Sequence, residues 1–147
     1  MTLEAILPLH KVVPSWTLAD AAGRPFSLFK PRGRAHTLLL VATAGFDIGG
    51  YLAEVAPHLA ELQGLPARGI AVLGTAKPPT VPSWTTLADS EGRVIHKYLP
   101  TGAQVGLFIL DRYSELYHQW VGAGGQALPP VVDAVEWIEA IGRQCAI

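Results

Sequence analysis

A strand, a helix and a second strand follow one another near the middle of this chain, and this succession constrains the fold more than any other feature. Residues 37–42 form a continuous apolar run, which is typical of a central strand covered on both faces. From 51 to 63 apolar residues recur at helical spacing, and Gly64 and Pro66 mark the expected helix end. Residues 70–74 are again apolar. This order predicts a right-handed parallel βαβ unit at the centre of an α/β sheet.

Shorter patterns on both sides of this unit complete the expected element order. Two short runs, 16–18 and 25–29, flank a polar break that contains Gly23, and they predict a β-hairpin at the start of the domain. The remaining patterns predict, in chain order, a loop, a short helix, a buried strand, its hairpin partner and a closing helix over residues 77–83, 91–98, 105–110, 116–121 and 129–142.

One short segment recurs in the sequence. Residues 13–20, Val-Pro-Ser-Trp-Thr-Leu-Ala-Asp, are repeated at 81–89 with one inserted threonine, and both copies continue to a Gly-Arg pair. Repeat architectures generally need at least three units to bury a core. We therefore interpret the recurrence as convergent turn chemistry rather than as a tandem duplication.

Composition bounds the number of domains and the class of partner. A chain of 147 residues is expected to form a single domain, 1–147, that buries more than half of the surface exposed by its unfolded chain. Half of the residues are apolar and only 16% are charged, so we expect a protein partner or a second copy to cover part of the surface. The formal net charge of −1 disfavours nucleic acid as a partner.

The sequence also predicts where the protein resides. No apolar run approaches the roughly 18 residues that would span a bilayer, and residues 1–10 lack the pattern of a signal peptide. A single cysteine, Cys145, cannot form an internal disulfide and is compatible with a reducing compartment. We therefore expect a cytoplasmic protein that does not bind a membrane. The lack of asparagine, with one methionine and twelve prolines, is compatible with a thermophilic source.

Segments near both ends of the chain carry a resemblance to a known family. Residues 14–18 combine a proline, an aromatic residue and a Thr-Leu pair, and they precede an Asp-containing turn, Gly23-Arg24 and a Ser-Leu pair. Residues 107–111 and 116–122 look like a late hairpin in which Ser114 stands where a turn glycine is usual. In this order the segments resemble the redoxin branch of the thioredoxin-fold superfamily, which includes peroxiredoxins of the alkyl hydroperoxide reductase type and related thiol reductases. The resemblance implies a three-layer thioredoxin-like fold with an N-terminal β-hairpin and a central mixed sheet.

The chemistry of that family depends on a thiolate at the junction between the central strand and the following helix, and this chain has no cysteine there. In one alignment the two cysteine positions fall on Gly49 and Leu52, and in another the reactive position falls on Tyr51. The family's cis-proline position falls near Val105. The degenerate redox site implied by the resemblance comprises Phe46, Asp47, Ile48, Gly49, Gly50, Tyr51, Leu52 and Val105.

The residues at this junction set what chemistry it can perform. The amides and dipole of a helix N-terminus lower a cysteine pKa, but glycine, tyrosine, leucine and isoleucine neither ionise near neutral pH nor cycle between oxidation states. We expect Asp47 to be the N-cap of the helix. The alternative is that Gly49 and Gly50, with free backbone amides, leave room for an anion or small ligand, although Asp47 would repel an anion.

Ionisable groups outside the junction have ordinary interpretations. Glu54, His58 and Glu61 lie one turn apart, and a solvated helix face is favoured over a metal-ligand face, so no metal and no cofactor are expected. Cys145 is interpreted as a terminal or helix-packing thiol. The alternatives are an intermolecular disulfide or a resolving cysteine, although a resolving cysteine needs a first thiol to attack.

These features predict a redox-silent binding or assembly module that self-associates and is not an enzyme. The main alternative is a peroxiredoxin-like thiol oxidoreductase or peroxidase that uses Cys145 as its catalytic residue. A third hypothesis is a carrier that holds a small ligand in the pocket around Phe46, Asp47 and Tyr51.

Overall fold

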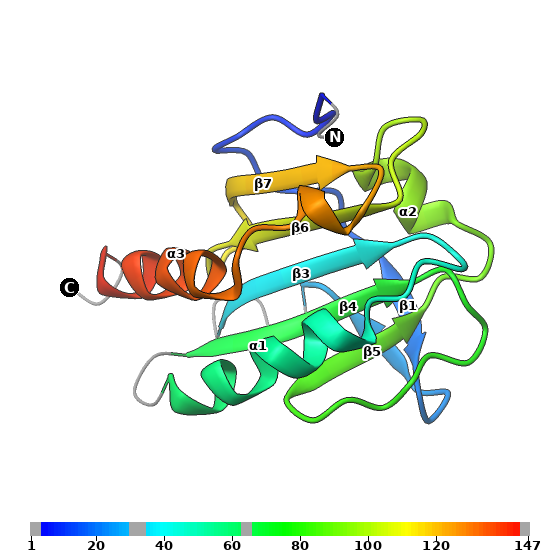
Figure 1. Cartoon of the computed structure of the whole chain (residues 1–147), viewed down its shortest axis with the longest axis horizontal. Coiled ribbons are helices and arrows are strands. Elements are labelled where there is room, and N and C mark those ends of the chain that lie inside the picture. Colours follow the sequence, from blue (N-terminus) through cyan, green and yellow to red (C-terminus); the bar gives the residue numbers. More distant parts are fainter. Residues whose placement is uncertain (1–3, 30–34, 63–65, 145–147) are drawn as a thin grey trace.

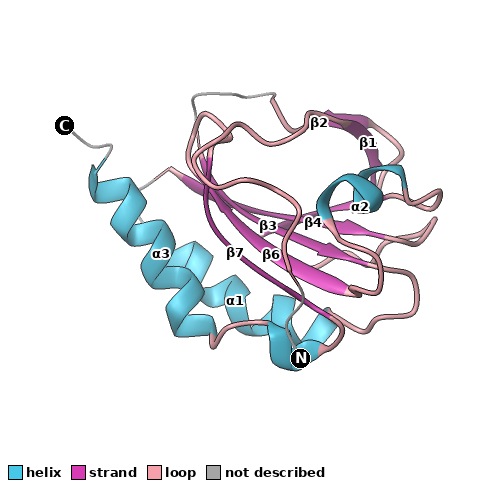
Figure 2. Ribbon diagram, turned by 90° about the horizontal axis from the view of Figure 1, so that it is seen from above, coloured by secondary structure: helices cyan, strands magenta, loops and turns pink. Residues whose placement is uncertain are grey.

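The computed structural model describes residues 4–29, 35–62 and 66–144, and in them one mixed sheet is covered by helices on both faces (Figures 1 and 2). The strands are β1 (Thr17–Asp20), β2 (Pro25–Ser27), β3 (His36–Ala42), β4 (Ala67–Leu73), β5 (Trp84–Ala88), β6 (Val105–Leu110) and β7 (Leu116–Gly122). The helices are α1 (Gly49–Glu61), α2 (Arg93–Tyr98) and α3 (Val131–Gln144), with the 3₁₀ turn η1 (Gly125–Ala127) before α3. The predicted α/β class is confirmed.

The strand order places β3 in the interior of the sheet. The order is β2-β1-β5-β4-β3-β6-β7, with β3, β4 and β5 parallel and the other neighbours antiparallel. All residues of β3 are buried, because helices or loops cover both faces of the sheet at this strand. The predicted βαβ unit is confirmed as β3–α1–β4, and the predicted hairpins are β1–β2 and β6–β7.

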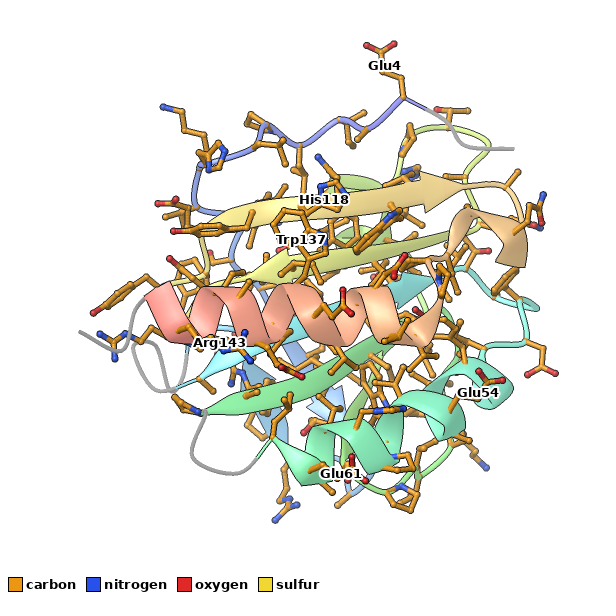
Figure 3. The ribbon with its side chains drawn as sticks, turned by 60° about the vertical axis from the view of Figure 1, so that its left-hand side comes forward. Glu4, Glu54, Glu61, His118, Trp137 and Arg143 are labelled. Atoms are coloured by element: carbon orange, nitrogen blue, oxygen red, sulfur yellow. The ribbon has the colours of Figure 1, made fainter. Side chains whose placement is uncertain are left out.

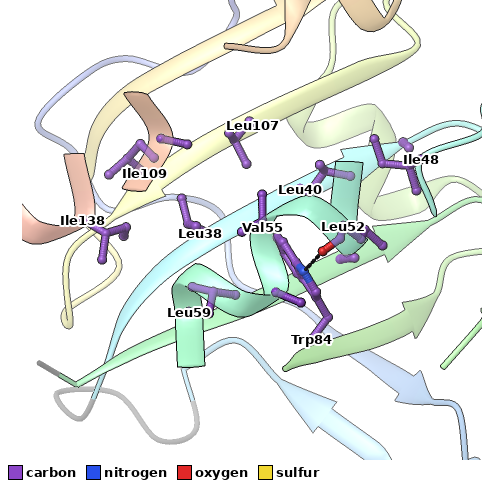
Figure 4. Packing of buried hydrophobic residues seen from close by; sticks show 14 of the residues in the cluster. Leu38, Leu40, Ile48, Leu52, Val55, Leu59, Trp84, Leu107, Ile109 and Ile138 are labelled. Carbon is purple, nitrogen blue, oxygen red and sulfur yellow. Dashed lines mark hydrogen bonds between the residues drawn. The ribbon is translucent and has the colours of Figure 1, made fainter. Parts of the chain in front are cut away.

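Two hydrophobic clusters lie on opposite faces of the sheet and give the three layers. Helices α1 and α3 cover one face and α2 lies on the other (Figure 2). Figure 4 shows part of the α1 and α3 cluster, whose members include Leu38, Leu40, Leu52, Leu107 and Ile138. The cluster on the opposite face includes Trp16, Leu39, Val41, Tyr98 and Phe108. The alternation of β3 side chains between these two clusters explains its continuous apolar sequence.

Several predicted boundaries were wrong. The first main helix begins at Gly49 rather than at residue 51, and it ends at Glu61 with Leu62 as its C-cap, whereas the predicted C-cap Gly64 lies outside the described residues. Strand β5 was not predicted at all, since residues 84–88 are short and polar in part and follow a proline-rich loop. It forms because β4 and β1 both pair with it.

Strand β4 begins earlier than its apolar run because an arginine is accommodated inside the sheet. Arg68 donates from Nε to Thr37 Oγ1 at 2.9 Å and from Nη2 to the Leu28 carbonyl at 2.9 Å. Burial lowers the pKa of Arg68. The next residue, Gly69, is required because a Cβ there would lie 2.7 Å from Cε3 of Trp84. Tertiary contacts therefore extend the strand beyond what hydrophobicity indicates.

The repeated segments lie side by side in the sheet. Their strands β1 and β5 pair antiparallel, with Ala19 opposite Ala88. Each copy ends in the same turn: the Asp20 carbonyl accepts from Gly23 N at 2.9 Å, and the Asp89 carbonyl accepts from Gly92 N at 3.0 Å. Both glycines have positive φ, 82° and 74°. The shared Asp-x-x-Gly turn accounts for the repeated aspartate and glycine.

A third turn of this kind contains a serine where the other two have glycine. The Asp111 carbonyl accepts from Ser114 N at 3.0 Å, and Ser114 has a φ of 68°. Side chains are disfavoured in this left-handed region, so Ser114→Gly is expected to raise the free energy of unfolding by about 0.5–1 kcal/mol in urea titrations. The converse change Gly23→Ser should lower it, because a Cβ at Gly23 meets nothing within 4 Å and only backbone strain is added. A destabilised Ser114→Gly variant would contradict this account.

Candidate functional site at the strand-to-helix junction

The junction between β3 and α1 lies at the C-terminal edge of the three parallel strands. After β3 the chain turns, and Phe46 N donates to the Thr43 carbonyl at 3.2 Å while Gly45 takes a φ of 81°. Thr43 N in turn donates to the Gln104 carbonyl, at 2.9 Å, in the segment before β6. Ligands of open α/β sheets bind at this edge, next to the point where strand order reverses. The sheet topology therefore places the predicted site where a ligand site is expected.

A pocket of about 330 Å³ opens at this junction. One wall is the segment 43–49 and the other is the segment after β4, with Leu73, Gly74, Thr75 and Pro79. Among the predicted site residues, those that line the pocket are Phe46, Asp47, Ile48 and Gly49. The predicted residues that do not line it are Gly50, Tyr51, Leu52 and Val105. The sequence analysis missed the second wall, which only the parallel pairing of β3 and β4 brings to the junction.

Asp47 accepts a hydrogen bond from a backbone amide at the start of α1, although it is not the N-cap residue. The N-cap of α1 is Ile48, which makes no side-chain capping bond, so the prediction that Asp47 is the N-cap was wrong. Asp47 Oδ1 instead accepts a hydrogen bond from Gly49 N at 3.1 Å. The acid lies near the helix start as predicted, but one residue before the capping position, which is occupied by Ile48, a core residue that is 5% exposed. A carboxylate thus stands at the pocket wall.

Tyr51 is engaged in a structural contact. Its hydroxyl donates to the Pro129 carbonyl at 3.0 Å, which joins the first turn of α1 to the segment before α3. Burial, followed by the charges of Glu54 and Asp133, raises the pKa of Tyr51 above its ordinary value. The phenol therefore stays neutral near physiological pH. No local sequence pattern indicates this contact, because Tyr51 and Pro129 lie 78 residues apart in the chain.

Loss of the Tyr51 hydroxyl is expected to weaken the contact between α1 and the segment before α3. Tyr51→Phe keeps the ring and leaves the Pro129 carbonyl without its donor, which should lower the free energy of unfolding by about 1 kcal/mol. Urea unfolding followed by far-UV circular dichroism measures the change. An unchanged free energy of unfolding would show that the bond does not contribute to the stability of the fold.

The other junction residues belong to the core. Leu52 is fully buried, and its carbonyl accepts from Trp84 Nε1 at 2.9 Å (Figure 4). Val105 is fully buried and pairs with Ala42 and Gly122. These positions are therefore filled by packing and leave no space for a ligand.

A second, smaller pocket adjoins the first and reaches α2. It has a volume of about 210 Å³ and shares Thr43, Ala44 and Gly74 with the junction pocket. On its far side lie Asp89, Glu91 and other residues at the start of α2. Asp89 is 3% exposed, and its Oδ2 accepts from Ile95 N at 2.8 Å. The two pockets form one surface region around the C-terminal ends of β3 and β4.

The remaining predicted groups lie outside the two pockets. Glu54, His58 and Glu61 are on α1, and no group of three His, Cys, Asp or Glu side chains within the described ranges is placed to hold a metal ion. Cys145 lies outside the described residues. No helix among those described is long and apolar enough to cross a membrane.

Searches against family models and curated protein sequences found no match. Solved structures with this fold include a thiol peroxidase from Chromobacterium violaceum, at 14% identity and a TM-score of 0.69. The match covers 98% of this chain and 92% of the thiol peroxidase chain. A putative protein disulfide isomerase from Bacteroides thetaiotaomicron has 13% identity and a TM-score of 0.74, and the match covers 97% of this chain and 95% of the isomerase chain. The mitochondrial 2-cys peroxiredoxin from Plasmodium falciparum has 15% identity and a TM-score of 0.72, and the match covers 91% of this chain and 94% of the peroxiredoxin chain. The chain therefore has the thioredoxin-like fold of the redoxins, with its single cysteine far in sequence from the strand-to-helix junction.

Proposed function

We propose that this thioredoxin-fold domain is a redox-silent binding and assembly module whose ligand-binding surface is the junction pocket. The observation that carries the proposal is the content of the junction: an apolar pocket of about 330 Å³ is open there, and no residue from 43 to 52 carries a thiol. The same place in the resembled family holds the reactive thiolate. Here the reactive position has either a glycine or a tyrosine whose hydroxyl is bonded to Pro129.

The pocket lining indicates the chemistry of the ligand. Phe46, Ile48, Leu73 and Pro79 supply apolar surface, which favours an apolar group of a small ligand or of a partner protein. Asp47 is the charged side chain among the lining residues, and its carboxylate disfavours an anionic ligand even though helix amides are near. The proposed ligand is therefore neutral or cationic, with an apolar end that enters the pocket.

Binding can be tested with an apolar dye and a pair of variants. An environment-sensitive dye should gain fluorescence on binding the wild type, and Thr75→Trp should abolish that gain by filling the pocket from its rim. Thr80→Trp adds the same ring in the same loop outside the pocket and should leave dye binding unchanged. Equal loss in both variants, or no dye binding to the wild type, would contradict the pocket as the binding surface.

The alternative is a thiol peroxidase or oxidoreductase that uses Cys145, and it is favoured by the fold match to a thiol peroxidase and a peroxiredoxin. Peroxide consumption and dithiol-coupled disulfide reduction should be measured for wild type and Cys145→Ser. The redox-silent proposal expects no turnover in either protein. Turnover that disappears in Cys145→Ser would assign catalysis to that residue and overturn the proposal.

A further inference from the structure

The segment before β1 exposes several large apolar side chains to solvent. Five large apolar side chains are exposed among the described residues, and three of them, Ile6, Leu9 and Val12, lie on this segment with 50%, 45% and 48% exposure. Scattered exposed apolar residues are normal, but a cluster on one short segment marks an interaction surface.

The segment is fixed against the sheet rather than loose. It runs along the outer side of β7 (Figure 1), where Gln119 Nε2 donates to the Leu7 carbonyl at 2.7 Å. Farther along, His10 N donates to the Leu116 carbonyl at 2.7 Å, and Leu116 N donates to the Lys11 carbonyl at 3.0 Å. Because these bonds hold the backbone, the outward side chains are presented in a set arrangement and lose little entropy on binding.

An apolar groove lies on a different part of the surface. It has a volume of about 360 Å³ and is lined by Ala53, Pro57 and Ala60 of α1 and by residues 81–83 before β5. Pro57 has no N–H, so the Ala53 carbonyl lacks its usual helical donor at the rim of the groove. The groove is preformed, since Trp84 binds the Leu52 carbonyl of α1 through Nε1. Small side chains here leave room for larger ones from a partner.

The charge beside Leu9 and Val12 is opposite in sign to the charges on α1. Glu54 and Glu61 are exposed on α1 (Figure 3), form none of the ion pairs found among the described residues, and lie in a stretch, 35–67, that has no lysine or arginine. The described part of the segment carries two exposed charged residues: Lys11 lies between Leu9 and Val12, whereas Glu4 lies at the other end, two residues before Ile6. An isologous contact through α1 would instead bring like charges together. A second copy can therefore approach the groove favourably with the part of its N-terminal segment that contains Lys11, and not with its own α1.

We propose that the chain self-associates head to tail, with Ile6, Leu9 and Val12 of one copy seated in the groove between α1 and residues 81–83 of the next. The two surfaces differ and lie by β7 and by β5, which are separated by other strands of the sheet. A heterologous contact of this kind generates rings or open chains. This inference deepens the assembly part of the proposed function and does not involve the junction pocket.

Sedimentation velocity over a range of protein concentrations tests the contact. The average mass should rise with concentration beyond that of a dimer, and Leu9→Ser should weaken association by about tenfold or more. Val132→Ser removes an equally exposed apolar side chain, 55% exposed on α3, and should leave association unchanged. A monomer at all concentrations, or an assembly that Leu9→Ser does not weaken, would overturn the proposal.

A charge reversal tests the orientation of the two copies. Lys11→Glu alone and the double variant Glu54→Lys with Glu61→Lys should each weaken association, and combining all three changes should restore it. Carbodiimide cross-linking of the wild type should join Lys11 of one copy to Glu54 or Glu61 of another. Failure of the triple variant to recover association would refute the head-to-tail pairing. The proposed ligand site at the junction pocket is tested separately, by dye binding, and does not depend on this result.

Discussion

Replacing Tyr98 by phenylalanine is expected to lower the free energy of unfolding by about 2–3 kcal/mol, a large effect for the loss of one oxygen atom. The Tyr98 hydroxyl donates to the Pro14 carbonyl at 2.6 Å and accepts from Trp16 Nε1 at 3.1 Å. Tyr98 is fully buried and Trp16 is 7% exposed, so water cannot readily replace the hydroxyl. The variant leaves a carbonyl and an indole N–H without their partner, and each unsatisfied buried group has its own cost.

The expected loss separates hydrogen bonding from packing. Tyr98→Phe retains the ring, including its edge-to-face contact with Phe108 at 5.4 Å between centroids, so the core volume is nearly unchanged. Tyr113→Phe is the matched control because Tyr113 is 47% exposed. Its stability should change by less than about 0.5 kcal/mol. Equal effects of the two substitutions in guanidinium titrations would show that the buried hydroxyl is not what anchors the N-terminal segment to α2.

Substituting Gly74 by alanine is expected to destabilise the protein by about 1–3 kcal/mol and to deform the junction pocket. A Cβ at this position would lie 2.6 Å from the backbone N of Ala44 and 3.2 Å from the backbone C of Thr43. Backbone atoms cannot rotate away as a side chain can, and Gly74 N is itself held by the Ala42 carbonyl at 3.0 Å. The segment after β3 must therefore move.

This substitution links stability to the proposed site because Gly74 lines both adjoining pockets. Gly74→Ala should reduce binding of the apolar dye under conditions in which the variant is still folded. Gly50→Ala is the matched control: a Cβ there meets nothing within 4 Å, and alanine favours the helix, so stability should rise by up to about 1 kcal/mol. Unfolding measurements with wild-type stability for Gly74→Ala would disprove the close approach of the two segments.

Periodicity was sufficient for the elements that bury a full face or stripe. The run at 37–42 predicted β3 because its side chains fill both core clusters in alternation, and the helical spacing after Tyr51 predicted α1 because its apolar stripe packs into one cluster. Strand β5 could not be recognised in this way. Its sequence mixes Trp84 and Leu87 with threonines, and its conformation depends on pairing with β4 and β1. Such pairing is a long-range property that a local pattern does not contain.

The candidate site was predictable on one side only. The absence of a thiol near Tyr51 and the acid at Asp47 are visible in the sequence. The opposite wall, around Gly74, becomes part of the site through the parallel register of β3 and β4, and the hydroxyl bond from Tyr51 to Pro129 joins residues distant in the chain. The sequence therefore showed that the junction carries no thiol, and the fold added the pocket in which the proposed ligand would bind.

The pairing between the two repeated segments has a consequence for the dynamics of the sheet. Strand β1 joins β5 through only two residue pairs, Ala19 with Ala88 and Asp20 with Leu87, and β2 is attached to the sheet through β1. We therefore expect the β1–β2 hairpin to open beyond its buried ends, Trp16 and Leu28, while the interior strands remain closed. Its amide hydrogens should exchange with solvent before those of β3, so one edge of the domain can fluctuate without disturbing the junction pocket.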